Sequence, residues 1–200
     1  MSKLLLIIDV QEDFFQSGRL ADKREDFTYS LNELVEAFRQ MHQPIVWVRQ
    51  VFKADLSDTY LALRQSTQQW TIEGTTGCEL LRECVRASNE PEIIKKRYSA
   101  FFGTELDTLL EELKPREIVI AGVNTHACVR VTAIDAYQRD FPLLLAQDCI
   151  DSYDEGCHNE SFSYLVNSGI GVPQSNQEIL SALLREPDIA ASQRKVCKQN

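Results

Sequence analysis

A cysteine stands where a helix is expected to begin, directly after a short apolar stretch. Residues 117–122 (Glu-Ile-Val-Ile-Ala-Gly) predict a buried strand, and residues 123–129, which include Cys128, predict the first turn of a helix. A helix N-terminus carries unpaired N–H groups and about half a positive charge. Such a position would lower the pKa of a thiol and offer donors to an anion that forms on a substrate. The alternative interpretation of Cys128 is a small, buried apolar side chain.

Two other segments bring ionisable groups to strand ends. The apolar run 4–8 (Leu-Leu-Leu-Ile-Ile) ends in Asp9, and residues 92–101 form a short apolar piece that contains Lys95 and Lys96. A short continuous apolar run is typical of a central parallel strand covered on both faces. Open α/β sheets bind ligands at the carboxyl ends of their strands. Each signal alone has a simpler explanation, since Asp9 could be a turn residue and the lysine pair a solvated surface.

Together these segments resemble the isochorismatase-like cysteine hydrolase superfamily, which includes nicotinamidases, N-carbamoyl amide hydrolases, ureidoacrylate hydrolases and isochorismatases. The resemblance covers nearly the whole chain and depends on three motifs in a fixed order. They are residues 9–14 (Asp-Val-Gln-Glu-Asp-Phe), 95–104 (Lys-Lys-Arg-Tyr-Ser-Ala-Phe-Phe-Gly-Thr) and 122–129 (Gly-Val-Asn-Thr-His-Ala-Cys-Val).

The resemblance implies a catalytic triad of Asp9, Lys95 and Cys128. Lys95 is chosen over Lys96 because the family's lysine stands three residues before the tyrosine of the Tyr-Ser-Ala-Phe run. In this reading Asp9 takes the thiol proton, Lys95 stabilises the anions, and the backbone N–H groups of Asn124 and Cys128 form the oxyanion hole. The family also implies a cis peptide bond between Val123 and Asn124.

His126 suggests a papain-like pair with Cys128, but residues two apart on a helix point to different sides. We therefore favour the aspartate and lysine pair, and place His126 at the mouth of the pocket. Relatives in the family often have Asn at the position of His126 and a small residue at that of Asn124. Four aromatic residues are candidates for the pocket walls and are also candidates for core or subunit contacts: Phe14, Trp70, Tyr98 and Phe101.

No metal or other cofactor is expected. Nicotinamidases of this superfamily carry an Asp-x-His pair and a further His soon after the second strand, whereas residues 49–55 read Arg-Gln-Val-Phe-Lys-Ala-Asp. This difference disfavours nicotinamidase activity. Isochorismatases cleave a vinyl ether and commonly lack the cysteine, so Cys128 favours C–N over C–O cleavage.

The composition predicts one globular domain over residues 1–200, with a polar tail after Pro187. The N-terminal apolar run is too short for a membrane span and lacks a small-residue cleavage site, which favours a cytoplasmic protein. The six cysteines form no Cys-x-x-Cys pair, and reduced thiols are expected. A net charge of −9 argues against nucleic acid or an anionic membrane as a partner. The expected partners are a small-molecule substrate and further copies of the chain, as a dimer or tetramer.

Alternating strand and helix patterns predict a mainly parallel sheet sandwiched between helices, a three-layer α/β/α fold of the Rossmann-like isochorismatase type. Ser30 is expected to cap a helix whose apolar stripe runs to Phe38, and a helix is expected around Leu80 and Leu81. The remaining expected strands are residues 44–48, 142–148 and 169–172. The remaining expected helices are one after Thr104 and those over about 125–138, 154–167 and 175–185.

The sequence therefore predicts a cysteine-dependent hydrolase of a C–N bond in a small amide, ureido or carbamoyl compound. Two alternatives remain: a C–O hydrolase of the isochorismatase type, and a non-catalytic binding or scaffold protein of the same fold. A thiol-redox protein is less favoured, because no resolving cysteine lies near Cys128 in the sequence. The substrate is left open, since loops such as residues 52–75 shape the pocket.

Overall fold

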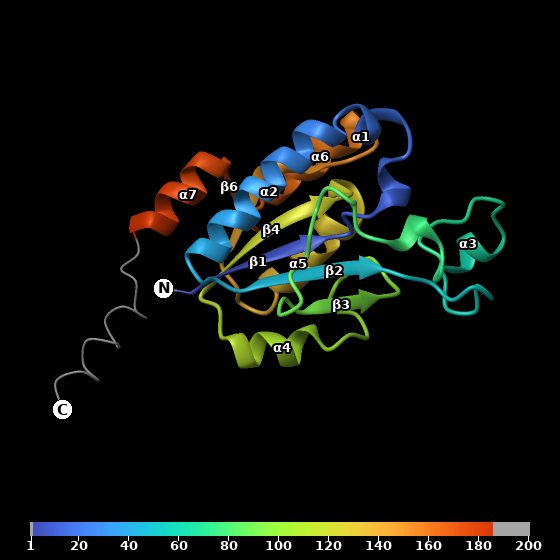
Figure 1. Ribbon diagram of the computed structural model, residues 1–200, viewed down its shortest axis with the longest axis horizontal. Helices are drawn as coiled ribbons and strands as arrows, with labels where there is room; N and C mark the ends of the chain where they lie inside the picture. Colours follow the sequence, from blue (N-terminus) through green and yellow to red (C-terminus); the bar gives the residue numbers. More distant parts are fainter. Residues whose placement is uncertain (1, 186–200) are drawn as a thin grey trace.

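A parallel sheet forms the centre of the protein, which is seen in a computed structural model that describes residues 2–185. Within these residues the sheet has six strands in the order β3-β2-β1-β4-β5-β6, and every pair of neighbours is parallel (Figure 1). The strands are β1 (Lys3–Ile8), β2 (Ile45–Gln50), β3 (Glu92–Lys95), β4 (Glu117–Val123), β5 (Leu143–Asp151) and β6 (Val172–Gln174).

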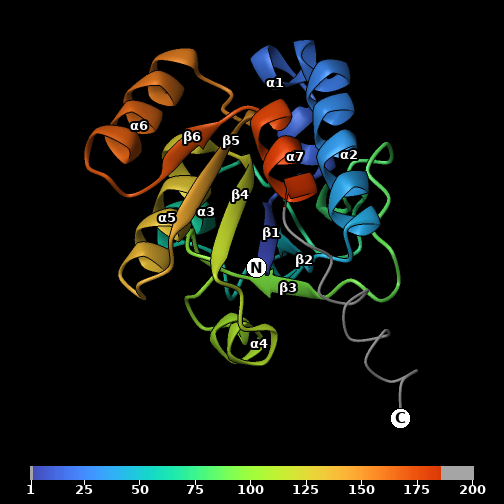
Figure 2. The same cartoon turned by 90° about the vertical axis from the view of Figure 1, so that its left-hand side faces the viewer.

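Helices cover both faces of this sheet, as Figure 2 shows. One face carries α1 (Gly18–Asp22), α2 (Arg24–Gln40) and α7 (Asn176–Arg185), and the other carries α4 (Leu106–Leu113), α5 (Arg130–Tyr137) and α6 (Glu155–Asn167). The short α3 (Leu61–Arg64) lies in a segment that projects beyond the end of β2 (Figure 1). Short 3₁₀ helices occur at Glu12–Phe15 and Thr76–Cys78. The predicted three-layer α/β/α fold is confirmed.

The apolar run of β1 is continuous because its two faces belong to two separate cores. Leu5 and Ile7 pack in the cluster that includes the buried side chains of α2 and α7, whereas Leu4, Leu6 and Ile8 pack in the cluster on the side of α4, α5 and α6. All five side chains are fully buried. Complete burial of such a side chain contributes about 1.5–3 kcal/mol relative to exposure, so β1 anchors both layers.

Gly122 allows β4 to approach β1 closely just before the site. Its partner across the ladder is Ile8, and a Cβ atom at Gly122 would lie 2.0 Å from the carbonyl oxygen of Ile8. Its φ of +120° also lies in the region that side-chain-bearing residues avoid. Glycine is therefore required on both steric and conformational grounds.

The strand order changes direction between β1 and β4. The chain runs outward from β1 to β2 and β3, then returns to the centre at β4 and continues to β5 and β6. Adjacent loops diverge at such a point, which leaves a crevice at the carboxyl ends of the two strands. Asp9 follows β1 and Asn124 follows β4. Because β1 and β4 are neighbours in the sheet, both residues lie at this crevice.

Several expected boundaries were wrong. The helix expected to start at Ser30 begins at Arg24, because buried Phe27 extends the apolar stripe by one turn. No helix forms around Leu80 and Leu81, since Leu81 N donates to Val10 O and Leu80 forms a bridge with Gln11. The last strand is Val172–Gln174, not 169–172, and β5 extends to Asp151. The tail expected after Pro187 lies outside the described residues.

Among residues 2–185, none of the helices combines the length and apolar character needed to cross a membrane.

Candidate active site

Lys95 joins the other two members of the predicted triad. Its Nζ atom lies 2.8 Å from Asp9 Oδ2, 3.2 Å from Cys128 Sγ and 3.1 Å from the carbonyl oxygen of Arg97. The ammonium donates hydrogen bonds to the sulfur and to the carbonyl oxygen, and forms an ion pair with the carboxylate. Lys95 and Asp9 are completely buried and Cys128 is 4% exposed. Residues from the ends of β1, β3 and β4 therefore meet at one buried point.

Lys96 points the other way, as expected for the next residue of an extended segment. Its Nζ atom lies 3.0 Å from Asp58 Oδ2 and also donates to the carbonyl oxygen of Val51. Lys96 is partly exposed. The structure thus brings Lys95, and not Lys96, to Asp9 and Cys128.

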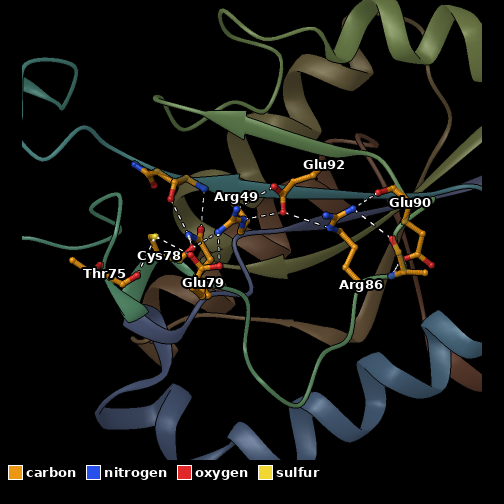
Figure 3. Close-up of polar contacts among 10 residues, drawn as sticks. Arg49, Thr75, Cys78, Glu79, Arg86, Glu90 and Glu92 are labelled. Carbon is orange, nitrogen blue, oxygen red and sulfur yellow. Dashed lines mark hydrogen bonds and ion pairs between the residues drawn. The ribbon is translucent and has the colours of Figure 1, made fainter.

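Polar contacts hold the strand ends that carry the site. Arg49 on β2 donates to Glu92 on β3 at 2.9 Å and to the carbonyl oxygen of Cys78 at 2.8 Å (Figure 3). Fully buried Gln11 donates to the carbonyl oxygens of Gln50 and Cys78 and accepts from Gln50 N at 2.9 Å. These contacts fix the 3₁₀ turn at Thr76–Cys78 against β2 and the segment that follows Asp9.

The backbone of Asp9 is held in an uncommon conformation. Its φ is 55°, in the left-handed region that aspartate tolerates better than most residues. Asp9 N donates to Val48 O at 2.9 Å, and Asp9 O accepts from Gln11 N at 2.9 Å. The chain therefore turns at Asp9, directly after β1, where its carboxylate meets the ammonium of Lys95.

Cys128 lies in a π-helical turn, Thr125–Val129, that precedes α5. The amides of Ala127 and Val129 both donate to the carbonyl oxygen of Asn124, whereas the amide of Cys128 is not a donor to that oxygen. The peptide bond between Val123 and Asn124 is cis, as the family resemblance implies. Single π-helical turns occur frequently at functional sites. The expected helix over 125–138 is therefore present but begins with a widened turn.

Burial controls the ionisation of the three groups. It raises the pKa of Asp9, and the charge of Lys95 offsets this only in part. Burial also raises the pKa of Cys128, and the carboxylate of Asp9 raises it further. For Lys95, burial alone would lower the pKa, but the charges of Asp9 and Cys128 outweigh it and raise the pKa. The expectation that the helix N-terminus lowers the pKa of this thiol is wrong, because the sulfur is buried beside a carboxylate.

A pocket of about 530 Å³ opens beside Cys128. Phe14, Trp70, Tyr98 and His126 line it, as does Asn124. Phe101 does not: it is 5% exposed, packs in the core against α4 and α5, and lies under the guanidinium of Arg139 at 4.2 Å from the ring centroid. The prediction of Phe101 as a pocket residue is wrong, because its side chain is on the core side of the segment.

Further lining residues were not predicted from the sequence, among them Asp13, Ser17, Gln50, Tyr60, Gln68 and Tyr153. Gln50 is the last residue of β2, which runs two residues beyond the expected strand 44–48, so the rule that identified Asp9 points to Arg49 instead. Tyr60 and Gln68 come from the projecting segment after β2, whose course no local pattern indicates. Tyr153 follows β5, which is longer than predicted.

In the part of the chain that the structure describes, no group of three or more His, Cys, Asp or Glu side chains is arranged to hold a metal ion.

The family model for the isochorismatase domain matches residues 3–177 of this chain. The chain belongs to the isochorismatase family. An isochorismatase family protein of Bacillus subtilis, YaaI, is 33% identical over 152 residues, which cover 75% of this chain and 81% of that protein. A probable inactive nicotinamidase of Arabidopsis thaliana is 29% identical over 84% of this chain and 90% of its own length.

Solved structures of the isochorismatase family superimpose closely on this one. A family member from Desulfovibrio vulgaris has a TM-score of 0.82 at 26% identity, covering 92% of this chain and 99% of that one. The nicotinamidase PncA of Bacillus subtilis has a TM-score of 0.75 at 29% identity, with coverage of 88% and 100%. The crevice at the ends of β1 and β4 therefore lies in a fold that this isochorismatase-family chain shares with both.

Proposed function

We propose that this isochorismatase-family protein is a cysteine-dependent hydrolase of a C–N bond in a small amide, ureido or carbamoyl compound. The observation that carries the proposal is the position of the buried Lys95 ammonium, 2.8 Å from Asp9 and 3.2 Å from Cys128. The family supports a hydrolase, and relatives that are nicotinamidases support an amide as substrate. Asp9 would be the base, Lys95 the electrostatic partner and Cys128 the nucleophile.

The resting site would contain the Asp9 carboxylate, the Lys95 ammonium and the neutral Cys128 thiol. The net charge of this arrangement is zero. A buried site requires this, because a second anion would have no cation to pair with. Transfer of the thiol proton to Asp9 leaves the net charge at zero, because one anion replaces the other beside the same ammonium. The raised pKa values of both acids are thus compatible with thiolate formation at the moment of attack.

The thiolate would attack the substrate carbonyl carbon, and the C=O electron pair would move to oxygen. The backbone N–H groups of Cys128 and Asn124 are the proposed donors to this oxyanion. Removal of one such donor in other enzymes costs about 2.7–4 kcal/mol of transition-state stabilisation. Collapse of the tetrahedral intermediate breaks the C–N bond, and protonated Asp9 gives its proton to the leaving ammonia or amine.

Water would then hydrolyse the thioester. Asp9, again a carboxylate, takes a proton from the water as its oxygen attacks the thioester carbonyl. A second tetrahedral intermediate expels the Cys128 thiolate, which regains its proton from Asp9. The acid product leaves, and the three groups return to their starting ionisation. No step requires a cofactor.

Two other functions share this fold. A C–O hydrolase of the isochorismatase type needs no cysteine, so the placement of Cys128 beside Asp9 and Lys95 favours the amide. A non-catalytic protein is suggested by the Arabidopsis relative described as a probable inactive nicotinamidase. The three buried, mutually paired groups favour catalysis, because such an arrangement is costly to keep for binding alone.

The test is turnover by Cys128→Ala and Cys128→Ser, with Cys157→Ser as a matched control at an exposed cysteine. A panel of small amides, ureido acids and carbamoyl compounds is assayed for ammonia release. Both Cys128 variants should lose turnover by at least about a thousandfold while they keep the fold, since the side chain is small. Mass spectrometry of acid-quenched wild type should show an acyl adduct on Cys128. Retained activity in either variant would contradict the covalent mechanism.

A further inference from the structure

His126 lines the pocket beside Cys128 but has no part in the proposed mechanism. Its Nδ1 atom lies 2.7 Å from the hydroxyl oxygen of Ser152, a fully buried residue just beyond β5. Its ring and the ring of Tyr153 pack nearly perpendicular to each other, with ring centroids 4.9 Å apart. The imidazole is therefore fixed on one side by a hydrogen bond and on another by an aromatic contact.

The hydrogen bond to Ser152 selects one tautomer of His126. Within residues 2–185, Nδ1 is the only hydrogen-bond partner of the Ser152 side chain. A buried hydroxyl rarely leaves its proton unpaired, so Ser152 donates to Nδ1 and the ring proton is on Nε2. Burial also lowers the pKa of His126, which keeps the ring neutral near pH 7. No described residue pairs with Nε2, so the Nε2–H of this pocket-lining side chain is free to donate to a ligand.

The charges around the pocket favour neutral ligands. Its described lining includes the carboxylate of Asp13 and no lysine or arginine. Asp13 is held there by the backbone amide of Thr71 and the side chain of Gln16. A substrate carboxylate would be near this negative charge, and the ammonium of Lys95 beside Cys128 is already paired with Asp9. Aromatic side chains, including Phe14, Trp70 and Tyr98, supply flat apolar walls.

We propose that His126 is a specificity-determining residue, which donates an Nε2–H hydrogen bond to an uncharged acceptor of the substrate other than the scissile carbonyl. Neutral, planar amides that carry such an acceptor are then preferred over ureido and carbamoyl acids. This inference rests on the proposed function for the chemistry of the scissile bond. It concerns ligand choice alone, so it can be tested by binding as well as by turnover.

The first test compares benzamide with the three pyridine-carboxamides, which replace one ring C–H by a nitrogen acceptor of the same size. For the wild type, kcat/KM for the best pyridine isomer should exceed that for benzamide by about tenfold, as one hydrogen bond allows. In His126→Phe this ratio should fall to within about threefold of one. A ratio that stays near the wild-type value would overturn the proposal.

Two further variants distinguish the effect of the His126 tautomer on the kcat/KM ratio from a nonspecific effect of substitution. Ser152→Ala removes the hydroxyl that fixes the proton on Nε2 and should lower the same ratio by at least about threefold. His42→Asn serves as the control and should keep the wild-type ratio, because His42 lies between α2 and β2, at the amino end of the strand and away from the pocket. Equal losses on all four amides in His126→Phe, with the ratio unchanged, would show a structural role only and contradict the proposal.

The charge argument has its own pair of ligands, an N-carbamoyl amino acid and its uncharged primary amide. The wild type should favour the uncharged compound by at least about tenfold, and Asp13→Asn should reduce that preference. Preference for the carboxylate would overturn the proposal.

Calorimetry with Cys128→Ala distinguishes failure of this inference from failure of the proposed function. Tighter binding of the best pyridine-carboxamide than of benzamide, lost in the double variant with His126→Phe, supports the role of His126 even if the wild type hydrolyses neither. The wild type could instead hydrolyse both benzamide and the pyridine-carboxamide, with neither the kcat/KM ratio nor the binding affinity depending on His126. That result would leave the proposed function intact and overturn the inference about His126.

Discussion

At the scale of single residues, the site is organised around a proton that two buried acids can hold. Asp9 and Cys128 both have raised pKa values, and Lys95 can neutralise only one anion at a time. The identity of the anion depends on small differences in environment, which substrate binding can change. In the resting state proposed above, the Lys95 ammonium pairs with the Asp9 carboxylate and the Cys128 sulfur keeps its proton.

This arrangement predicts opposite effects of Asp9→Asn on the thiol and on turnover. The Asp9 charge raises the pKa of Cys128, so its removal should lower that pKa and speed alkylation of Cys128 by iodoacetamide near pH 7 by severalfold or more. Turnover should fall by at least about a thousandfold, because an amide cannot accept the proton. In the wild type the alkylation rate should rise with pH above the usual thiol value of about 8.5. Slower alkylation of Asp9→Asn than of the wild type would contradict this resting state.

The adjacent lysines provide a matched pair of variants. Lys95→Met removes the ammonium that contacts both acids, so kcat should fall by several orders of magnitude and the pKa of Cys128 should rise further. Lys96→Met removes only contacts with Asp58 and Val51 and should change kcat by at most a few fold. Steady-state kinetics and alkylation rates measure both effects. Exchanged phenotypes would show that Lys96 is the functional lysine.

Residue identities were predictable where a motif fixed the register, as for Lys95 and its neighbour. The direction in which the pKa of Cys128 shifts was not predictable, because it depends on burial by residues that are distant in the sequence. Phe101 shows the same limit: the sequence indicates an aromatic residue near the site, but the side of the chain on which it packs depends on α4, α5 and Arg139.

At the scale of elements, a buried carboxylate holds the long connection between β2 and β3. Glu90, 8% exposed, accepts from Trp47 Nε1 on β2 at 2.7 Å and from Arg39 Nε on α2 at 2.7 Å. It also accepts from the backbone amide of Ala87 at 3.0 Å. Figure 3 shows Glu90 next to Arg86, which faces Glu92 on β3. The start of β3, and hence the course of the strand toward Lys95, depends on these contacts.

Glu90→Gln should lower the free energy of unfolding at pH 7 by about 2–4 kcal/mol, since buried donors lose their charged acceptor. Burial alone would raise the pKa of Glu90, but the hydrogen bonds from Arg39, Ala87 and Trp47 outweigh it and lower the pKa. Its stabilising effect is therefore complete above the usual glutamate pKa of about 4.3 and is lost as pH falls through the lower folded value. Urea unfolding should thus show a smaller difference between variant and wild type at pH 3 than at pH 7. Glu36→Gln, on the exposed face of α2, serves as control and should have little effect at either pH.

Elements with a strong local pattern were predicted well, and those defined by distant contacts were not. The run 4–8 and the stretch 117–122 became β1 and β4 because continuous apolar residues need two covered faces. The start of α2 was missed although Phe27 stands four residues before Leu31, a spacing that indicates another helical turn. The segment around Leu80 was misassigned because its backbone partners, Val10 and Gln11, lie far away in the sequence.

At the scale of the whole molecule, the sheet carries Asp9, Lys95 and Cys128 at its strand ends, and a projecting segment completes the pocket. Residues 51–78 leave the sheet after β2 and project beyond it (Figure 1). Their base is held by Phe52, whose N–H donates to Thr71 O and whose carbonyl oxygen accepts from Glu73 N, each at 2.8 Å. Tyr60 and Trp70 of this segment line the pocket. Sequence patterns predicted the sheet, but the wall depends on a loop without periodicity.

Substitution of the two tryptophans tests whether the sheet and the projecting segment have these separate roles. Trp47 on β2 is fully buried, so Trp47→Ala should lower the free energy of unfolding by about 3–5 kcal/mol. Trp70 is only partly buried and lines the pocket, so Trp70→Ala should raise KM by about tenfold and change the free energy of unfolding by less than about 1 kcal/mol. Urea unfolding and steady-state kinetics separate the two effects. Similar losses of stability in both variants would show that the projecting segment unfolds together with the sheet. The pocket wall that carries Trp70 would then be part of the cooperative core.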